Sequence, residues 1–483
     1  MSAVKFPKGF SWGVSTSSYQ IEGAAFEDGR GTSIWDTYCH EPQRVFHGDT
    51  GDVACDHYHR LEADLDLIAG LGVDVYRFSI AWPRIQPLGT GPANLQGLEF
   101  YARVIDGLHA RGVRPVPTLY HWDLPQALQD RGGWANREII ECFASYTQIL
   151  IDAFGDRVPM WTTINEPWVA AHLGYGIGIH APGIADESQA AAAHHHLLLA
   201  HAAALEVIRR TRPDSKVGIA LNLMHIYSGS DHADDRAAAD LADCQLNRSM
   251  LDPLFKGRYP DQLGSLSAHW HANAGLVQVH DLQRIQAKLD FLSINSYHPR
   301  YVVAPGRVDI ARQNGFAGGY ESPFTFGLPF VDVHPGQAAK TDAGWLIEPQ
   351  GFHDLIVRLG RDCPHVPLYV SENGAAYADY AGPDGAVIDS ERVGYLDGHF
   401  RAAQAAIETG VDLRGYWVWS LMDNFEWSFG FSKRFGLVYV DYATQVRTPK
   451  SSYEWFRGVV RNGSLPDLTG VFPNLAMSAP KFP

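Results

Sequence analysis

The amino-acid sequence predicts an α/β protein built as a single (β/α)8 TIM barrel with long loops after its strands. Two observations carry this prediction. Short runs rich in β-branched and aromatic residues alternate with helix-like runs along the chain, and no linker or low-complexity segment interrupts them. A length of 483 residues suits one large barrel with insertions, so we expect residues 1–483 to form one domain.

The predicted strands are short and largely apolar, as expected of buried strands. The eight runs are SWGVSTS (11–17), VDVYRFSI (73–80), VRPVPTLY (113–120), MWTTIN (160–165), KVGIALN (216–222), FLSINSY (291–297), PLYVSE (367–372) and RGYWVWSL (414–421). Eight strands are the number that this closed barrel requires.

The segments between these runs are helix-like, because their apolar residues recur with a period of about 3.6. They are residues 56–72, 98–112, 136–155 and 188–210, of which the first three end on glycine. A doubly wound sheet is the alternative. It is disfavoured because no strand-to-helix junction carries GxGxxG, and the spacing of Gly174, Gly176 and Gly178 leads into a loop.

Composition and charge exclude several classes of protein. Hydrophobic residues make up 46% of the chain and charged residues 19%, which does not match a disordered protein. The 39 Lys and Arg against 54 Asp and Glu give a net charge of −15 without a basic cluster, so we expect no nucleic-acid and no membrane partner. There is also no run of about 20 apolar residues that would span a membrane.

The five cysteines bear on the compartment. They are odd in number, scattered and without a CxxC pair, so neither a disulfide framework nor a structural zinc site is indicated. The N-terminal segment lacks the apolar stretch of a signal peptide. We therefore expect a cytoplasmic protein, and a homo-oligomer is compatible with the sequence.

Residues at the ends of the predicted strands indicate the site, because the active site of such barrels lies at the carboxyl ends of the strands. The polar residues there are Gln20, Arg77, His121, Asn165 with Glu166, Asn222, Asn295 with Tyr297, Glu372 with Asn373, and Trp419. Glu166 and Glu372 follow the fourth and seventh strands, so their carboxylates can face each other across the mouth of the barrel.

Two facing carboxylates with amides, an arginine and aromatic rings are the groups needed to hydrolyse a glycosidic bond. One carboxyl protonates the leaving oxygen, and the other attacks the anomeric carbon or activates water. Aromatic residues make up 12% of the chain, and several stand beside polar residues, as suits a sugar whose C–H faces pack on rings. We therefore expect a small-molecule glycoside as the substrate.

Two motifs extend this prediction to a family. TINEP (163–167) and YVSENG (369–374), with a likeness that runs from residues 6–24 to residues 435–452, make the chain resemble glycoside hydrolase family 1, the β-glucosidase family. The resemblance implies a retaining, exo-acting β-glucosidase without a cofactor or metal. It would remove terminal non-reducing β-D-glucosyl residues from β-glucosides and cello-oligosaccharides by double displacement.

The resemblance also implies a role for each site residue. Glu166 matches the acid/base and Glu372 the nucleophile, which Arg77 and Tyr297 hold, with Asn295 beside them. Residues that match the family's contacts with the non-reducing sugar are Gln20, His121, Trp122, Asn165, Trp419, Glu426 and Trp427. Residues that match the wall around the leaving group are Trp168, His180 and Trp345.

Electrostatics supports the two catalytic roles. Glu372 must be ionised to attack, and the Arg77 cation and the Tyr297 hydroxyl are expected to stabilise its charged form. Glu166 must be protonated, and burial together with a like charge opposite is expected to raise its pKa, each unit being worth about 1.4 kcal/mol. The residues alone leave open which glutamate has which role; the resemblance assigns them.

Some of these features have other interpretations. The Asn-Glu-Pro at 165–167 is also a favourable helix start. The histidines at 194–196 resemble a metal cluster, but consecutive helical residues point in different directions, so a solvated or packed helix face is favoured. His57 and His59 have the spacing of a metal pair but open a helix. Three tryptophans are expected in the core: Trp12, Trp134 and Trp161.

Proteins of other classes fit less well. A metal-dependent barrel hydrolase needs clustered ligands at strand ends, and there only His121 fits. A non-catalytic glycan- or protein-binding barrel would be expected to lose one of the two glutamates.

Other activities within the family are weighed by single residues. Glu426 would repel the phosphate of a phosphoglucoside, and Glu166 stands where thioglucosidases have glutamine. Galactosidase or fucosidase activity is open, because Gln20 and Glu426 can serve either C4 epimer. Ser296 replaces a tyrosine common in the family, which we expect to alter packing rather than chemistry.

Three geometric expectations follow for a retaining exo-acting enzyme. The carboxyl groups of Glu166 and Glu372 should lie about 5–5.5 Å apart, against roughly 6.5–9.5 Å in an inverting enzyme. Both should lie at the base of a pocket that is closed at one end. The rim should include the leaving-group residues and a long Gly/Pro-rich loop around 304–335.

Overall fold

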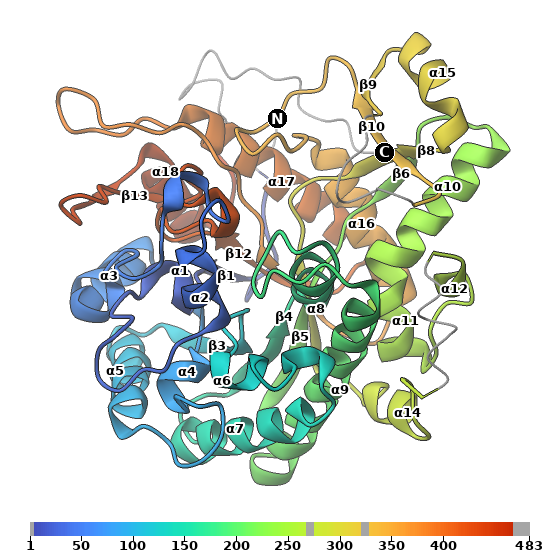
Figure 1. Cartoon of the computed structure of the whole chain (residues 1–483). Coiled ribbons are helices and arrows are strands. Elements are labelled where there is room, and N and C mark those ends of the chain that lie inside the picture. Colours follow the sequence, from blue (N-terminus) through green and yellow to red (C-terminus); the bar gives the residue numbers. More distant parts are fainter. Residues whose placement is uncertain (1–3, 267–274, 320–327, 467–483) are drawn as a thin grey trace.

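Eight parallel strands close into a barrel that helices surround (Figure 1). The computed structural model describes residues 4–266, 275–319 and 328–466. The barrel strands are β1 (Ser11–Ser15), β2 (Val75–Ser79), β3 (Arg114–Tyr120), β4 (Met160–Asn165), β5 (Lys216–Asn222), β7 (Phe291–Asn295), β11 (Leu368–Glu372) and β12 (Leu413–Trp419). Each lies in one of the eight predicted runs or within one residue of it, and the predicted (β/α)8 fold is confirmed.

The strand register brings several predicted site residues to one end of the barrel. Ser15 of β1 lies opposite Arg77 of β2 and opposite Trp419 of β12. Glu372 of β11 lies opposite Asn295 of β7. Because all the barrel strands run in the same direction, these residues lie together at the carboxyl ends of the strands.

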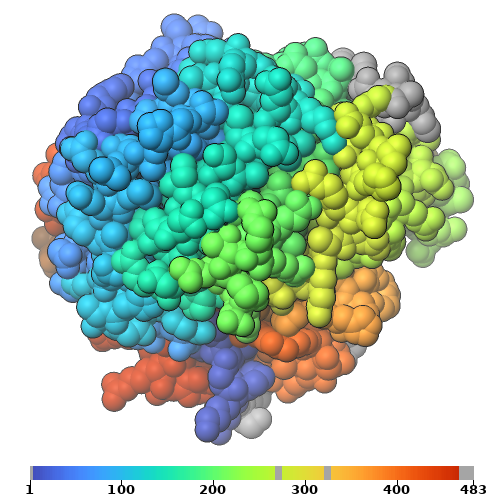
Figure 2. All heavy atoms as spheres, turned by 90° about the horizontal axis from the view of Figure 1, so that it is seen from below, coloured from blue at the N-terminus to red at the C-terminus, as the bar shows by residue number. Residues whose placement is uncertain are grey.

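Helices cover the outside of the barrel. The four predicted helical segments form α3 (His57–Leu71), α5 (Leu95–Ala110), α7 (Ile139–Phe154) and α9 (Glu187–Thr211), and the later helices are α16 (Pro349–Asp362), α17 (Ser390–Glu408) and α18 (Ser451–Asn462). Gly72 ends α3 with a left-handed φ of 75°, as the terminal glycine predicts. In Figure 2, segments from blue through green to yellow lie side by side in chain order and form a continuous surface.

Shorter helices lie in the connections between these elements. The α-helices are α1 (Ser18–Ile21), α2 (Ile34–His40), α4 (Trp82–Ile85), α6 (Gln126–Gln129), α8 (Pro167–Ala171), α10 (Ala233–Asp243), α11 (Ser249–Lys256), α12 (Leu263–Leu266), α14 (Asp281–Ile285) and α15 (Val308–Gln313). The 3-10 and π segments are η1 (Phe46–Gly48), η2 (Gly133–Ala135), η3 (His172–Ile177), η4 (Cys244–Arg248), η5 (Pro305–Arg307) and η6 (Trp427–Phe429).

Two small sheets stand beside the barrel. One has the order β6 (Ile226–Ser228), β8 (Arg300–Val303), β10 (Val331–Pro335), β9 (Phe316–Gly318), and the other pairs β13 (Val438–Val440) with β14 (Arg447–Pro449). The prediction of one long loop around 304–335 is therefore wrong for much of its length, although residues 320–327 lie outside the described residues. Strands and a helix form there because Val303, Val333 and Ala311 pack into a small apolar core.

The barrel core contains the three tryptophans that the sequence places there, Trp12, Trp134 and Trp161, all of them buried. The five cysteines have free thiols, and four of them are buried. Across the described residues, no helix combines the length and the apolar character needed to cross a bilayer.

Candidate active site

A cavity of about 650 Å³ opens at the carboxyl ends of the barrel strands. Twelve of the fifteen predicted site residues line it: His121, Trp122, Glu166, Trp168, His180, Asn295, Tyr297, Trp345, Glu372, Trp419, Glu426 and Trp427. The other three, Gln20, Arg77 and Asn165, are completely buried and bond to residues of the lining. The structure therefore brings all fifteen together.

Glu166 is the first residue after β4 and the N-cap of α8. Its backbone has a left-handed φ of 48°, and its N–H donates to Ala220 O of β5 at 2.8 Å. Two other residues of the lining, Trp122 and Trp427, also have positive φ, at 77° and 51°. Left-handed backbone is strained for bulky residues, and such strain is often found at functional sites.

Asn295 connects Glu166 to the barrel. Its amide Nδ2 donates to Glu166 Oε1 at 2.7 Å and to Asn165 Oδ1 at 2.9 Å. Its Oδ1 accepts a hydrogen bond from Ser371 Oγ at 2.7 Å. Since both ends of the amide are engaged, its orientation is defined, and Glu166 receives a neutral donor rather than a cation.

Glu372 is the last residue of β11, where the pairing of β11 with β7 shifts just before it. Arg77 Nη1 donates to Glu372 Oε1 at 2.5 Å, and Tyr297 Oη donates to Oε2 at 2.7 Å. Arg77 is completely buried, and only 3% of the surface of Glu372 is exposed. Charge-assisted bonds of this kind are strong when they are shielded from water.

The two carboxyl groups differ in their electrostatic surroundings. Burial, with a contribution from the charge of Glu372, raises the pKa of Glu166 to about 8. Burial also raises the pKa of Glu372, but the Arg77 cation and the hydrogen bonds from Arg77 and Tyr297 oppose this rise. Because Arg77 pairs with Glu372, the proton of this coupled pair lies on Glu166.

His121 stands at the end of β3 with one ring nitrogen engaged. Asn165 Nδ2 lies 3.0 Å from Nε2, and the other end of that amide, Oδ1, accepts from Arg77 Nη2 at 2.6 Å. Burial and the Arg77 cation lower the pKa of His121 well below its usual range, so the ring is neutral. Its proton therefore lies on Nδ1, which is buried and has no hydrogen-bond partner among the described residues.

Gln20 and Glu426 meet on the same side of the cavity. Gln20 lies in α1, just after β1, and its Nε2 donates to Phe425 O at 2.8 Å and lies 3.4 Å from Glu426 Oε2. Burial and the charge of Glu372 raise the pKa of Glu426 to about 8. Glu426 lines the cavity, so a third carboxyl group lies there together with those of Glu166 and Glu372.

Aromatic rings form much of the wall. The Trp427 ring lies 4.5 Å from that of Trp122, and the His121 ring lies 6.0 Å from that of Trp419 at an interplanar angle of 23°. At the outer part of the wall, Trp345 lies 5.0 Å from the Tyr297 ring. Flat apolar faces beside polar groups suit the C–H faces and hydroxyls of a sugar ring.

The outer wall contains residues that sequence reasoning missed. Phe435 lines the cavity and its ring lies 6.1 Å from that of Tyr297, so it supports the residue that bonds Glu372. Its signal was its place at the start of the 435–452 motif. The four-stranded sheet β6-β8-β10-β9, called the accessory sheet from here on, adds Arg300, Asp332 and His334 to the lining. No local sequence pattern identifies these three as cavity residues, because only the position of the sheet beside the barrel brings them to the cavity.

The histidines at 194–196 lie in α9 with separate partners. His194 Nε2 lies 3.1 Å from Ser249 O, His195 Nε2 lies 3.0 Å from Asp281 Oδ2, and His196 Nδ1 lies 2.8 Å from Trp134 O. All three rings are buried. The sequence left a solvated or a packed helix face open, and the structure shows the packed one.

Barrels that hold two carboxyl groups across such a pocket form a class, the barrel glycoside hydrolases, and the fold and geometry described above place this chain in it. Residues 2–464 match the family model described as "Glycosyl hydrolase family 1". The chain belongs to glycosyl hydrolase family 1.

Individual relatives agree with this family. "Beta-glucosidase A" of Thermotoga maritima is 44% identical over 472 residues, which cover 97% of this chain and 100% of the relative. A "Bifunctional beta-D-glucosidase/beta-D-fucosidase" of Bifidobacterium breve is 44% identical over 471 residues, with 95% and 99% covered. The solved family 1 β-glucosidase of Thermotoga maritima in complex with isofagomine lactam has a TM-score of 0.88 at 44% identity, covering 96% of this chain and 100% of that one.

Proposed function

We propose that this protein is a retaining, exo-acting β-glucosidase, with Glu372 as the nucleophile and Glu166 as the acid/base. The observation that carries the assignment of roles is the asymmetry of the pair: Arg77 lies 2.5 Å from Glu372, whereas Glu166 receives an amide N–H from Asn295. An ionised carboxylate beside a protonated carboxyl is the starting state that double displacement requires.

In the first step, a Glu372 oxygen attacks the anomeric carbon while Glu166 gives its proton to the glycosidic oxygen. The C–O bond breaks, the leaving group departs as an alcohol, and Glu372 becomes a neutral glycosyl ester. Loss of its negative charge removes one cause of the raised pKa of Glu166. Glu166 then takes a proton from water, which attacks the ester and releases β-glucose and the Glu372 carboxylate.

We propose that the sugar being cleaved binds against the inner part of the cavity. We assign its hydroxyl contacts to His121, Asn165, Gln20 and Glu426, with Trp122, Trp419 and Trp427 as further contacts. This is supported by the positions of His121 and Glu426 on the cavity lining. Trp168, His180 and Trp345, with the accessory sheet, would contact the leaving group. Relatives named for glucosidase and for combined glucosidase and fucosidase activity support glucosides first, with fucosides as a second substrate.

We further propose that residues 1–483 act as one catalytic unit in the cytoplasm, where the enzyme would complete the breakdown of cellulose by trimming cello-oligosaccharides. The five free thiols support a reducing compartment. The cavity of about 650 Å³ has room for a terminal sugar and part of its leaving group.

A comparison of initial rates on a small panel of substrates tests this proposal. The panel contains 4-nitrophenyl β-glucoside, β-galactoside and β-fucoside, together with cellobiose and longer cello-oligosaccharides. We expect the glucoside to have the highest kcat/KM and glucose to be the first product from every oligosaccharide. Release of cellobiose as the main product from cellotetraose would contradict exo-action on single glucosyl residues.

A further inference from the structure

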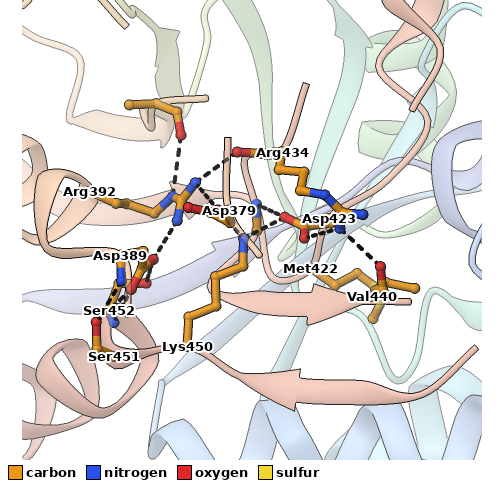
Figure 3. A network of polar contacts seen from close by, with 12 residues as sticks. Asp379, Asp389, Arg392, Met422, Asp423, Arg434, Val440, Lys450, Ser451 and Ser452 are labelled. Carbon is orange, nitrogen blue, oxygen red and sulfur yellow. Dashed lines mark hydrogen bonds and ion pairs between the residues drawn. The ribbon is translucent and has the colours of Figure 1, made fainter. Parts of the chain in front are cut away.

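Six charged side chains form a compact cluster behind the cavity, which we call the buried ion network: Asp379, Asp389, Arg392, Asp423, Arg434 and Lys450 (Figure 3). Three are cations and three are carboxylates, so their formal charges cancel. All except Arg434 have side chains that are at most 4% exposed. The network lies outside the cavity lining, and the proposed chemistry does not use it.

One arm of the network holds the segment that carries Glu426. Asp423 lies three residues before Glu426 and accepts three hydrogen bonds: from Arg434 Nη1 at 2.7 Å, from Gly436 N at 3.0 Å and from Lys450 Nζ at 2.6 Å. The Asp423 N–H also donates to Val438 O of β13. Segment 420–436 is therefore fastened to β13 and to the residue that precedes α18.

The other arm holds the segment that follows Glu372. Asp379 accepts from Lys450 Nζ and from Arg392 Nη2, both at 2.6 Å. Arg392 Nε also donates to Ala375 O at 3.3 Å, three residues after Glu372, and its Nη2 donates to Arg434 O at 2.7 Å. Segment 373–379 is thus tied to the same network as segment 420–436.

The two segments also touch through their backbones, because Tyr377 N donates to Arg434 O at 3.2 Å. A side chain at Gly374 would place its Cβ 1.7 Å from Trp419 O, and one at Gly436 would place it 2.0 Å from Asp423 N. Neither position has room for a Cβ. The glycine of YVSENG is therefore explained by the close approach of segment 373–379 to the end of β12, and Gly436 by the folding of segment 420–436 back on itself.

Lys450 is the connection between the two arms. Its Nζ lies 2.6 Å from an oxygen of Asp379 and 2.6 Å from an oxygen of Asp423, and the side chain is fully buried. If its charge were removed, two buried carboxylates would lose a shared cation, and their repulsion would push the arms apart. The ammonium group thus opposes a separation of Glu372 from Glu426.

We propose that Lys450 and Asp423 are positioning residues that set where Glu426 stands relative to Glu372, and so determine the preference for a sugar that carries a C6 hydroxymethyl group. This inference rests on the proposed function, in which Glu426 contacts a hydroxyl of the sugar while Glu372 attacks the anomeric carbon, and it assigns that contact to the C4 or C6 hydroxyl. Neither positioning residue touches the substrate. They act by holding together the loops that follow β11 and β12.

The test compares Lys450→Met and Asp423→Asn with a matched control, Asp389→Asn. Asp389 belongs to the same network, but its side chain bonds to Arg392, Ser451 and Ser452, on the side away from segment 420–436. For each protein, kcat and KM are measured with 4-nitrophenyl β-glucoside and with 4-nitrophenyl β-xyloside, which lacks the hydroxymethyl group. The melting temperature is recorded, and all assays are run at least 10 °C below the lowest value.

We expect all three variants to melt earlier than the wild type. In Lys450→Met and Asp423→Asn, the glucoside-to-xyloside ratio of kcat/KM should fall about tenfold, which corresponds to ~1.4 kcal/mol. Asp389→Asn should keep the wild-type ratio. If Lys450→Met does not fold, the inference is tested with the isosteric Asp423→Asn alone, by the same tenfold fall in the glucoside-to-xyloside ratio of kcat/KM.

An unchanged ratio in the folded positioning variants would show that the network serves stability alone. An equal loss in Asp389→Asn would show general loosening, and either result overturns the inference. A wild-type protein that hydrolyses neither glycoside would instead refute the proposed function, and the inference with it, so the two failures are distinguishable.

Discussion

Arg77 bonds Glu372 with one terminal nitrogen and Asn165 with the other, at 2.5 Å and 2.6 Å. Asn165 is the last residue of β4 and directly precedes Glu166, so one guanidinium links the ends of the two strands that carry the carboxyl groups. The same contact places the positive charge on the side of Glu372. Arg77 therefore contributes both to the position of the two carboxyl groups and to the placement of the proton on Glu166.

Glu372→Ala should abolish turnover, because it removes the proposed nucleophile. Azide is small enough to occupy the vacated space and should restore activity toward an activated aryl glucoside. Since azide would attack directly from the side of Glu372, the product should be the α-glucosyl azide. The anomer formed is identified by NMR, and a β-azide would reassign the nucleophile.

Glu166→Ala should slow substrates according to their leaving groups. A glucoside with a poor leaving group, such as cellobiose, needs protonation of the departing oxygen and should lose about 10²–10⁴-fold in its glycosylation rate. A dinitrophenyl glucoside needs little protonation and should lose far less in kcat/KM, which reports that step. Equal losses for both substrates would move the acid role to another residue.

The pH dependence of kcat/KM should be bell-shaped. Activity should fall on the alkaline side as Glu166 loses its proton with a pKa of about 8, and on the acid side as Glu372 gains one. Arg77→Met should move the acid limb to higher pH, because the cation lowers the pKa of Glu372. A profile of Arg77→Met that keeps the wild-type acid limb would contradict this account.

Hydrolysis should retain the configuration at the anomeric carbon, and the carboxyl groups of Glu166 and Glu372 should have the separation of a retaining enzyme. The first product from an aryl β-glucoside should be β-glucose, seen by NMR before mutarotation, and the two carboxyl groups should lie about 5–5.5 Å apart in a crystal structure with a bound inhibitor. Release of α-glucose, or a separation beyond 7 Å, would indicate an inverting enzyme.

Protonated Glu166 should make stability depend on pH. Its folded pKa of about 8 exceeds the unfolded value of about 4.3, so the stability it confers is complete below pH ~4.3 and is lost as pH rises through about 8. The slope should be at most ~1.4 kcal/mol per pH unit within this window. Glu166→Gln should remove this contribution and leave that of Glu426, whose pKa is also raised to about 8, so its gain in melting temperature over the wild type should increase from pH 5 to pH 8. A gain that is constant across this range would show that Glu166 is not buried in its protonated form.

Local sequence patterns were sufficient to predict the strands of the barrel. The runs at 160–165 and 216–222 became β4 and β5 with the predicted bounds, because β-branched and aromatic residues in a short buried run strongly favour a strand. The accessory sheet was missed. Its strand β9 has three partly buried residues, and β10 has five residues of which only Val333 is buried, so the segment shows turn residues more clearly than a strand pattern.

By itself, the sequence determined the succession of strands and helices and the two motifs that mark the family. The contacts that differentiate the carboxyl groups were decided only by tertiary structure. Arg77 and Glu372 are 295 residues apart, and Gln20 and Glu426 are 406 apart, so no local pattern encodes their pairing. A pKa depends on burial and on nearby charges, and both arise only when barrel closure brings distant strand ends together.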